Sequence, residues 1–499
     1  MDFLDPRKHR KHMIRLVIGY VLIGLGILVA TVILLYQAYG FGLGKDGQVV
    51  QNGLVFVSSQ PGDAQILLDG KEYKDTTNTR LQLAEGTYKL DIKRKDYRTW
   101  QRTVNVTGGS VVRYDYPLLI PNNLTATPLK NFSSLPGLAT QSPDRRWLLT
   151  QQVGSTQVFE VHDLGDPKAV TEDVTALSLP DSVISSPDSD GQSWQLTEWS
   201  TDNRHAVLQH AFAGGTEYIL VDRTDAAKTV NLTKTLKLNP GQVLSLHDKK
   251  FDKYYLSDPS AKTVSSVDLD DPATVTPELT NVLAFKSYGQ DILLYATETD
   301  APAGKVLTML KDGDVTYKIR DHAAGGPYLL DLAQYDGDWY VAVGSSVDNK
   351  VYVFRNPQAV RKTGKIQNLV PVQVLRVTAP NYLAFSSNTR FVMIENATSF
   401  AIFDAETDKN YTYATSQPLD APQSHAVWMD GHRVSYVSGG KLVIFDYDNI
   451  NMQTLSAASP NFLPFFDRDY RNLYSITPPT SATGQSILTQ TNLLTPTDQ

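Results

Sequence analysis

The sequence predicts an all-β protein that begins with one transmembrane helix and continues as a small β-sandwich and a β-propeller. Three observations predict this order: an apolar run without charge near the start, alternating apolar residues between turn signals in the next segment, and a two-strand unit that recurs through the rest. Because the chain has 499 residues, it is too long for one hydrophobic core, and two or more folding units are expected.

The composition narrows the class of protein. Hydrophobic residues make up 41% of the chain and charged residues 20%, which is ordinary for a folded protein, and 25 Tyr with 17 Phe favour strands. The chain contains no Cys, so disulfides, thiolate metal sites and cysteine nucleophiles are excluded.

Residues 16–36 are predicted to cross a membrane. This run of 21 residues carries no charge and is rich in Leu, Ile and Val, enough for a helix to span a hydrocarbon core of about 30 Å. Five basic residues lie in the segment 1–15, whereas the 20 residues after the run contain only Lys45 as a basic residue. Basic flanks stay in the cytoplasm, so residues 1–15 are expected there and the bulk of the chain outside the cell membrane.

A cleaved signal peptide is the alternative to a permanent anchor. Its apolar core is about 7 to 15 residues long, shorter than this run, so we expect the helix to be retained. Ala38 and Gly40 are nevertheless the kind of small residue found at a cleavage site, and cleavage stays open. Residues 37–53 contain five glycines and no hydrophobic period, which predicts a flexible tether.

Residues 54–118 have the pattern of a small β-sandwich. Val55 and Val57 alternate with other residues, as half-buried strands do. Asp69-Gly70 lies between two such runs and predicts a hairpin, because glycine adopts the positive φ of a type I′ turn. Further alternating strands follow, the last of them expected through Trp100.

These residues resemble the PEGA domain, a family of small β-sandwich modules in envelope and surface proteins of bacteria and archaea. The resemblance rests on turn and core positions: Ser58-Ser59-x-Pro61, Ala64 with Ile66 and Leu68, Asp69-Gly70-Lys71, Leu83-x-x-Gly86-x-Tyr88, and Tyr97. Three positions depart from the family pattern: Pro61-Gly62-Asp63-Ala64 replaces Pro-Glu-Gly-Ala, Thr76-Thr77 replaces Thr-Pro, and Asp96 replaces a glycine. The resemblance implies a surface-protein module and carries over no catalytic residue.

After an expected linker at 119–127, a two-strand unit recurs through residues 128–495, and residues 496–499 are expected to form a tail. In each unit a polar turn introduces an apolar strand, and a second turn leads to another strand that ends near an acidic or polar residue. The clear copies lie at 142–164, 200–223, 288–313, 335–356, 386–408 and 429–448, and fainter ones at 251–269 and 467–488.

The spacing of the copies predicts the number of blades. The turn residues from Asp144 to Asp469 are 325 positions apart over seven intervals, about 46 residues each, which matches a four-stranded propeller blade. Eight blades are therefore predicted, and seven stay possible because the copy near Phe251 is weak. The pattern resembles WD40-like and quinoprotein-type propellers in architecture only; no cofactor-binding set is recognised, so no cofactor is expected.

The charge distribution argues against a nucleic-acid partner. Residues 119–499 carry 30 basic and 42 acidic groups, so the propeller has a charge of about −12 and repels phosphate backbones. Within the sandwich, the basic cluster Lys93, Arg94 and Lys95 is a candidate contact for anionic lipid heads or an acidic wall polymer. The alternative is a solvated strand edge that lysines protect from pairing.

No catalytic or metal-binding motif is recognised. The motifs G-x-S-x-G and H-E-x-x-H and a Gly-rich phosphate loop are absent, and two His pairs, His205 with His210 and His425 with His432, lack helical metal spacing. The stretch 186–194 has two Asp and a Gly at positions of a Ca²⁺ loop, but its first ligand position is Ser. We interpret it as an acidic surface loop.

Three tryptophans are candidate ligand contacts. Trp199, Trp339 and Trp428 lie just before or at the start of predicted blade strands, where aromatic rings can stack on sugar rings. Packing between blades is the alternative role and the favoured one.

We expect a non-enzymatic scaffold or binding protein of the cell envelope, in which the sandwich positions the propeller and the propeller binds a protein or glycan. Two alternatives stay open. A propeller hydrolase or lyase acting on extracellular glycans would need carboxylates that converge on the central channel. A transmembrane sensor would need a partner in the membrane, because about 15 cytoplasmic residues are too few for an output domain.

Overall fold

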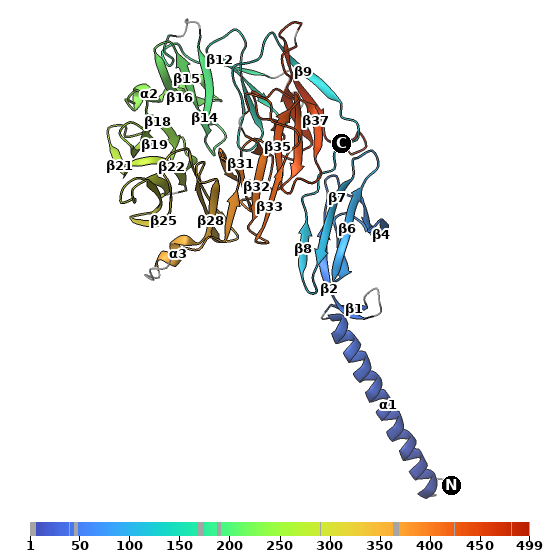
Figure 1. The fold of residues 1–499 in the computed structure, drawn as a ribbon. Helices are drawn as coiled ribbons and strands as arrows, with labels where there is room; N and C mark the ends of the chain where they lie inside the picture. The colour runs from blue at the N-terminus through green and yellow to red at the C-terminus, as the bar shows by residue number, and fades with distance from the viewer. Residues whose placement is uncertain are drawn as a thin grey trace. The chain divides into compact units, whose positions relative to one another are not determined.

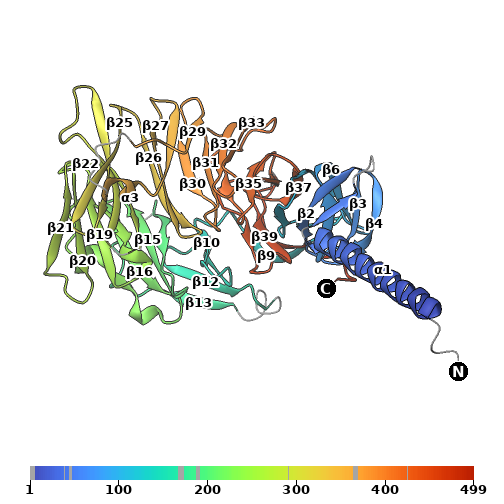
Figure 2. The ribbon, with the colours of Figure 1, turned by 90° about the horizontal axis from the view of Figure 1, so that it is seen from below.

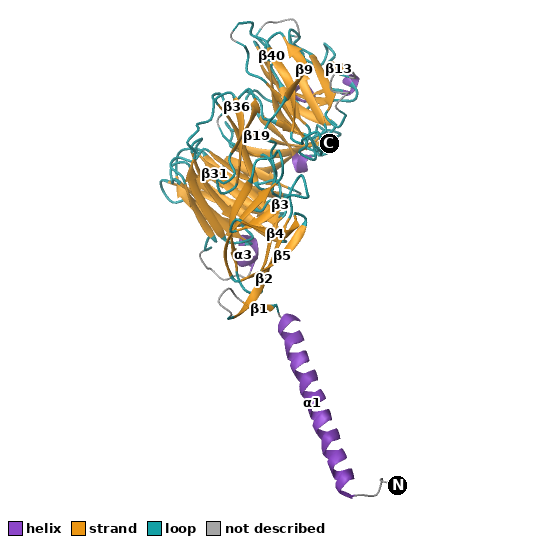
Figure 3. Ribbon diagram, turned by 90° about the vertical axis from the view of Figure 1, so that its right-hand side faces the viewer, coloured by secondary structure: helices purple, strands orange, loops and turns teal. Residues whose placement is uncertain are grey.

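The computed structural model describes residues 6–38, 40–43, 48–166, 174–186, 191–289, 291–362, 369–423, 425–480 and 482–498. The chain divides into two units: Met1–Asn123 together with Leu494–Gln499, and Leu124–Leu493. Strands are the commonest regular secondary structure in both units, and α1 is the long helix (Figure 3).

Helix α1 runs from Pro6 to Ala38 and is longer than the predicted run. Its segment Arg10–Tyr36 is long and apolar enough to cross a membrane, and none of its hydrophobic stretch is buried. The helix begins before residue 16 because no helix breaker follows Pro6, and proline itself is favoured in the first helical turn.

The prediction of a flexible tether over residues 37–53 is wrong at its C-terminal end. Strand β1 (Phe41–Leu43) pairs with β2, and β2 spans Val49–Val57. Gly53 lies within β2, where an added Cβ would meet Val106 Cγ1 at 2.6 Å. This glycine therefore permits close packing and is not part of a flexible segment. Residues 44–47 lie outside the described residues.

Two four-stranded sheets form the sandwich (Figure 1). One has the order β1-β2-β5 with β8 beside β2, and the other has the order β4-β3-β6-β7. Its further strands are β3 (Gln65–Leu68), β4 (Lys71–Thr76), β5 (Thr79–Ala84), β6 (Gly86–Lys93), β7 (Trp100–Val106) and β8 (Val111–Tyr114). The core lies between the sheets, with Val55, Leu81 and Leu83 on one side and Ile66 and Leu90 on the other. Strand β8, parallel to β2, was not predicted.

Turn residues of the sandwich play the structural parts expected of them. Leu68 pairs with Lys71, and Asp69 and Gly70 between them have φ of 49° and 78°, as a type I′ turn requires, so the predicted hairpin is confirmed. The hydroxyl of Thr77 accepts a hydrogen bond from Ala64 N at 2.9 Å and lies 2.8 Å from the hydroxyl of Ser59. The threonine pair at 76–77 thus still ties down the turn before β3.

The boundaries of the sandwich differ from the predicted ones. Leu119 and Ile120, expected in the linker 119–127, are buried, and Ile120 O accepts a hydrogen bond from Arg98 N at 2.8 Å. The first propeller strand, β9, begins at Ala126, before the expected start at 128. Residues 494 and 495 belong to the sandwich unit, although the propeller was expected to extend to 495.

Eight four-stranded sheets make up the second unit within the described residues, which confirms the eight predicted blades. Seven blades use consecutive strands, and the eighth joins β38, β39 and β40 to β9 from the other end of the unit (Figure 2). The blades are β10 (Ala139–Gln141), β11 (Trp147–Gln151), β12 (Val158–Asp163), β13 (Thr175–Ser178); β14 (Ser193–Trp199), β15 (His205–Phe212), β16 (Gly215–Asp222), β17 (Val230–Asn231); β18 (Val243–Leu246), β19 (Lys253–Asp258), β20 (Thr263–Asp268), β21 (Val275–Thr280); β22 (Val282–Tyr288), β23 (Ile292–Thr297), β24 (Lys305–Asp312), β25 (Val315–Ala323); β26 (Tyr328–Tyr335), β27 (Asp338–Ser345), β28 (Lys350–Arg355), β29 (Gln373–Arg376); β30 (Tyr382–Phe385), β31 (Phe391–Glu395), β32 (Ser399–Asp404), β33 (Lys409–Ala414); β34 (Val427–Trp428), β35 (Arg433–Ser438), β36 (Lys441–Asp446), β37 (Gln453–Ala457); and β38 (Phe465–Phe466), β39 (Asn472–Ile476), β40 (Ser486–Asn492), β9 (Ala126–Phe132). Short helices α2 (Leu232–Thr235) and α3 (Pro357–Lys362) and 3₁₀ turns η1 (Ala226–Lys228) and η2 (His247–Lys249) lie between strands.

Each recurring sequence unit is the hairpin of the second and third strands of a blade. The faint copy near Phe251 corresponds to β19 and β20, which belong to a complete blade. The first strands of neighbouring blades touch each other, as β22 does with β26 and β26 with β30. First strands therefore line the central channel. We call the end where they begin the entry end, and the end where they turn into the second strands the exit end.

Candidate functional site

A cavity of about 610 Å³ lies at the entry end of the channel. Its wall comes from the first half of β14, from β10 and from the segment around β38. Leu196 and Leu463 are 39% and 52% exposed there, and Gln195 and Asn461 add side-chain amides. None of the described residues that line this cavity carries a charge. We call it the entry cavity.

A second cavity, of about 620 Å³, lies at the exit end and has a different chemistry. It is lined by the last residues of β14, including Glu198, and by Lys249 and Lys286. Glu198 accepts hydrogen bonds from Lys249 Nζ at 2.7 Å and from Leu246 N at 3.1 Å. Its carboxylate is therefore already bound by the next blade.

Asp331 on β26 is another carboxylate bound at the channel wall. It is 8% exposed, accepts hydrogen bonds from Leu332 N at 3.1 Å and Phe385 N at 3.2 Å, and lies 3.5 Å from Lys286 Nζ. Burial raises the pKa of Asp331, although Lys286 and both hydrogen bonds act in the opposite direction. A carboxyl group with these partners joins three blades.

The three candidate tryptophans each contact the preceding blade. Trp199 is 6% exposed, and its indole donates to Thr140 Oγ1 at 3.0 Å. The half-buried ring of Trp339 lies 5.0 Å from that of Tyr288, and the indole of half-buried Trp428 donates to Ala384 O at 3.2 Å. The geometry favours the packing role, and ligand contact by these rings stays a prediction.

The basic cluster of the sandwich does not form a single open patch. Lys93 and Lys95 are exposed at the end of β6 and in the turn after it, but the guanidinium of Arg94 forms an ion pair with Asp498 and donates to Gly62 O. Tyr97 Oη donates to Asp498 Oδ2 at 2.8 Å and accepts from Thr495 N at 2.8 Å. Thus the segment after the last propeller strand returns to the sandwich, and its Asp498 forms an ion pair with Arg94.

Blade 2 contains a buried polar network that sequence reasoning missed. The ring nitrogens of His210 lie 2.9 Å from Glu217 Oε1 and 2.7 Å from Gln192 Oε1. Burial alone would raise the pKa of Glu217, but hydrogen bonds from His210, Ser185 and Asn231 lower it to about 2. The register of the β15–β16 hairpin pairs His210 with Glu217, so this register was the signal that could have found the network.

The described residues form no candidate metal-binding site. No three of their His, Asp and Glu side chains come together as ligands of one ion. Part of the candidate Ca²⁺ stretch 186–194, namely residues 187–190, lies outside the described residues. In the other His pair, His425 stacks on Tyr382 at 4.0 Å between ring centroids, as a side chain in a packed loop does.

Comparisons with known proteins identify the first domain and find solved structures that are similar to the chain. The PEGA domain family matches residues 52–120. Solved structures of β-propeller proteins are similar to the chain. Hsv2 of Kluyveromyces lactis is 10% identical with a TM-score of 0.38, over 66% of this chain and 98% of that one. Oligogalacturonate lyase of Vibrio parahaemolyticus is 11% identical with a TM-score of 0.38, over 76% and 100%.

A third similar structure, dihydro-heme d1 dehydrogenase NirN, is 12% identical with a TM-score of 0.42, over 65% of this chain and 66% of that one. At these values the similarity says nothing about activity. No curated protein matches the chain. The chain contains a PEGA domain at residues 52–120, joined to an eight-bladed β-propeller.

Proposed function

We propose that this protein is a non-enzymatic scaffold or binding protein of the cell envelope, held in the membrane by α1, whose propeller binds an uncharged part of a protein or glycan partner. The entry cavity carries this proposal. Its volume of about 610 Å³ falls within the range of about 300 to 1,000 Å³ that is usual for binding pockets.

The chemistry of the entry cavity suits binding better than catalysis. Hydrolysis or elimination needs groups that give and take protons, and the described lining residues include no ionisable side chain. Exposed Leu196 and Leu463 offer apolar contact, and Gln195 and Asn461 offer both donors and acceptors. Such a surface is suited to a neutral sugar ring or to an uncharged loop of a protein.

Two carboxylates of the channel wall support the non-enzymatic role. A glycan hydrolase or lyase would use a pair of carboxyl groups that are free to meet substrate. Glu198 and Asp331 are each held by a lysine and by backbone N–H groups. Both carboxylates therefore have a structural role, because they link neighbouring blades.

The start of the chain supports a location outside the membrane. Residues Arg10–Tyr36 of α1 are long and apolar enough to span, and the basic residues before them favour a cytoplasmic N-terminus. PEGA domains are generally extracellular. We infer that the sandwich and the propeller stand on the outer side.

A binding experiment with a matched control tests the proposal. The full chain in detergent is measured against a panel of neutral and charged envelope glycans and against purified envelope proteins from the same cells. Leu463→Ser is compared with Val315→Ser, because these residues are 52% and 51% exposed and Val315 lies on the last strand of a blade, away from the channel. We expect Leu463→Ser alone to weaken binding, by about tenfold. Equal binding by both variants would place the ligand elsewhere.

A further inference from the structure

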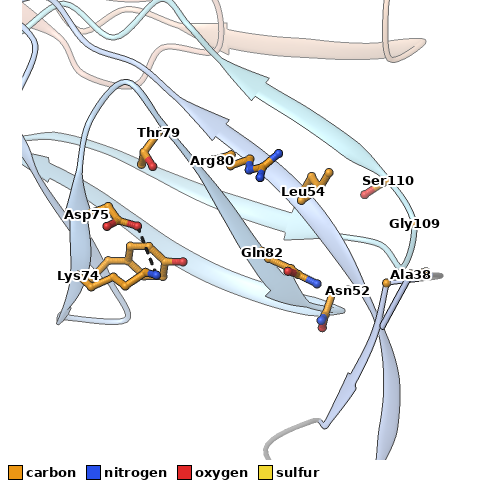
Figure 4. Close-up of a pocket in the computed structure, with 12 residues that line it drawn as sticks. Ala38, Asn52, Leu54, Lys74, Asp75, Thr79, Arg80, Gln82, Gly109 and Ser110 are labelled. Atoms are coloured by element: carbon orange, nitrogen blue, oxygen red, sulfur yellow. Dashed lines mark ion pairs between the residues drawn. The ribbon is translucent and has the colours of Figure 1, made fainter. Parts of the chain in front are cut away.

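The sandwich contains a polar cavity of about 810 Å³ next to the end of α1. Figure 4 shows the side chains that line it, from Ala38 at the end of the helix to β5. Its polar lining includes Asn52, Lys74, Thr79, Arg80, Gln82 and Ser110. We call it the anchor cavity.

The anchor cavity lies within a short distance of the membrane span. The span ends at Tyr36, and Ala38 and Gly40 both line the cavity. Gly40 O accepts a hydrogen bond from Asn52 N at 2.7 Å, which holds β2 to the chain leaving the helix. Ala38 lies two helical residues beyond Tyr36, a rise of about 3 Å, and the headgroup layer is about 5 to 7 Å thick on each side. The cavity therefore begins at the level of the lipid headgroups.

The outer face of the sheet beside the cavity is basic and apolar. Val55, Leu81 and Leu83 point into the core, so the residues between them point outward. The register places Phe56 between Arg80 on β5 and Arg113 on β8. On the same face, Leu54 lies between Gln82 and Val111.

Neither arginine on this face is neutralised by an acidic group in the part of the chain that the structure describes. The side chain of Arg80 has no ion pair or hydrogen bond there, and the guanidinium of Arg113 lies 4.4 Å from the ring centroid of Phe56. The one carboxylate of the described cavity lining, Asp75, lies 3.8 Å from Lys74 Nζ. The positive charge of both arginines is thus available to an outside ligand, in contrast with that of Arg94.

We propose that the anchor cavity and the Arg80–Arg113 face bind the phosphate of an anionic phospholipid in the outer leaflet. Arginine presents a planar fork of N–H groups that matches phosphate oxygens, and the amides and hydroxyls of the cavity add further donors. Leu54 and Val111 pair two positions nearer to α1 than Phe56 and provide apolar contact for the part of the lipid below its phosphate. The inference rests on the proposed retention of α1 in the membrane.

Lipid retention by the full chain tests the proposal. The chain is placed in nanodiscs of phosphatidylcholine with or without phosphatidylglycerol, released into detergent, and weighed by native mass spectrometry to count bound phosphatidylglycerol. Arg80→Gln combined with Arg113→Gln is compared with Lys93→Gln combined with Lys95→Gln, a matched removal of two exposed positive charges from the same domain. Inorganic phosphate is added in a parallel series.

We expect the arginine pair to lower the affinity for phosphatidylglycerol by about tenfold, while the lysine pair leaves it nearly unchanged. Equal lipid binding by both variants, or a loss confined to the lysine pair, would overturn the proposal. Displacement of the lipid by inorganic phosphate would do the same, because the ligand would then be the free anion. The intact mass also shows whether α1 is still attached, so failure of the anchor is distinguished from failure of the lipid site.

Discussion

The two ends of the propeller channel differ in the charge of the residues that line them. At the exit end, Glu198 of blade 2 binds Lys249 of blade 3, and the ionisable groups there hold neighbouring blades together. At the entry end, the described cavity lining is uncharged, and Leu196 and Leu463 are exposed. The difference teaches that residues with internal partners stabilise the ring, whereas residues left without them are available to a ligand.

The largest predicted change in the free energy of unfolding comes from a buried carboxyl group at the entry end of blade 6. Glu395 is 0% exposed, and its Oε1 accepts a hydrogen bond from Ala426 N at 3.2 Å. Burial raises the pKa of Glu395 to about 7 from 4.5, against the effect of its backbone hydrogen bonds. Burial therefore dominates the behaviour of this carboxyl group, whereas Glu198 forms an ion pair with Lys249.

The sign of the pH effect follows from the raised pKa. The stability that Glu395 contributes is fully present below pH 4.5 and is lost as the pH rises through about 7. The total loss is about 3 kcal/mol. In chemical unfolding, Glu395→Gln should therefore gain stability relative to the unmodified chain across this window. A difference that stays constant with pH would contradict the burial of an ionisable group there.

The second largest predicted change in the free energy of unfolding comes from Asp331. Asp331→Leu removes the acceptor of the Phe385 N–H and the partner of Lys286, so the free energy of unfolding should fall by about 2 kcal/mol. Asp331→Asn keeps an acceptor and is the control, with a smaller loss. If the leucine variant unfolds at the same denaturant concentration as the unmodified chain, Asp331 does not hold the inner strands together.

A smaller effect is expected for Glu198 at the exit end. Its ion pair with Lys249 is partly exposed, so Glu198→Gln should cost about 0.5 to 1 kcal/mol, and the cost should shrink in high salt. Denaturant unfolding at low and high ionic strength measures both the loss of stability and its dependence on salt. A cost that does not depend on salt would mean that the hydrogen bond to Leu246 N, and not the charge, matters.

The smallest effect on stability belongs to the entry cavity. Leu196→Ser and Leu463→Ser change exposed side chains and should shift the free energy of unfolding by less than about 0.5 kcal/mol. The same variants should weaken ligand binding. A loss of stability comparable to that of Asp331→Leu would show that the two ends do not differ in the way described above.

The sequence predicted the blades because their second and third strands form local hairpins. A turn residue, an apolar strand and a second turn recur within each hairpin, and this local chemistry is visible without a structure. The first strands carry no such signal: β10 has three residues and β38 has two. The entry cavity, built on these strands, therefore could not be predicted.

The charged surfaces show a second limit of sequence reasoning. Lys93, Arg94 and Lys95 are adjacent in the chain and were predicted to form one basic cluster. In the structure, however, Arg94 forms an ion pair with Asp498, 404 positions away. Arg80 and Arg113 are distant in sequence and share one face of the sheet only because both strands pair with β2 at Phe56. Strand register, which single-sequence patterns do not specify for distant strands, decides which basic groups act together.

Protease protection of the full chain, carrying a tag at its C-terminal end, tests the central claim most directly. We predict that protease added outside intact cells digests the propeller and the sandwich and leaves a short membrane fragment that contains α1. Complete protection until the membrane is opened would contradict the account, because the binding domains would then lie in the cytoplasm.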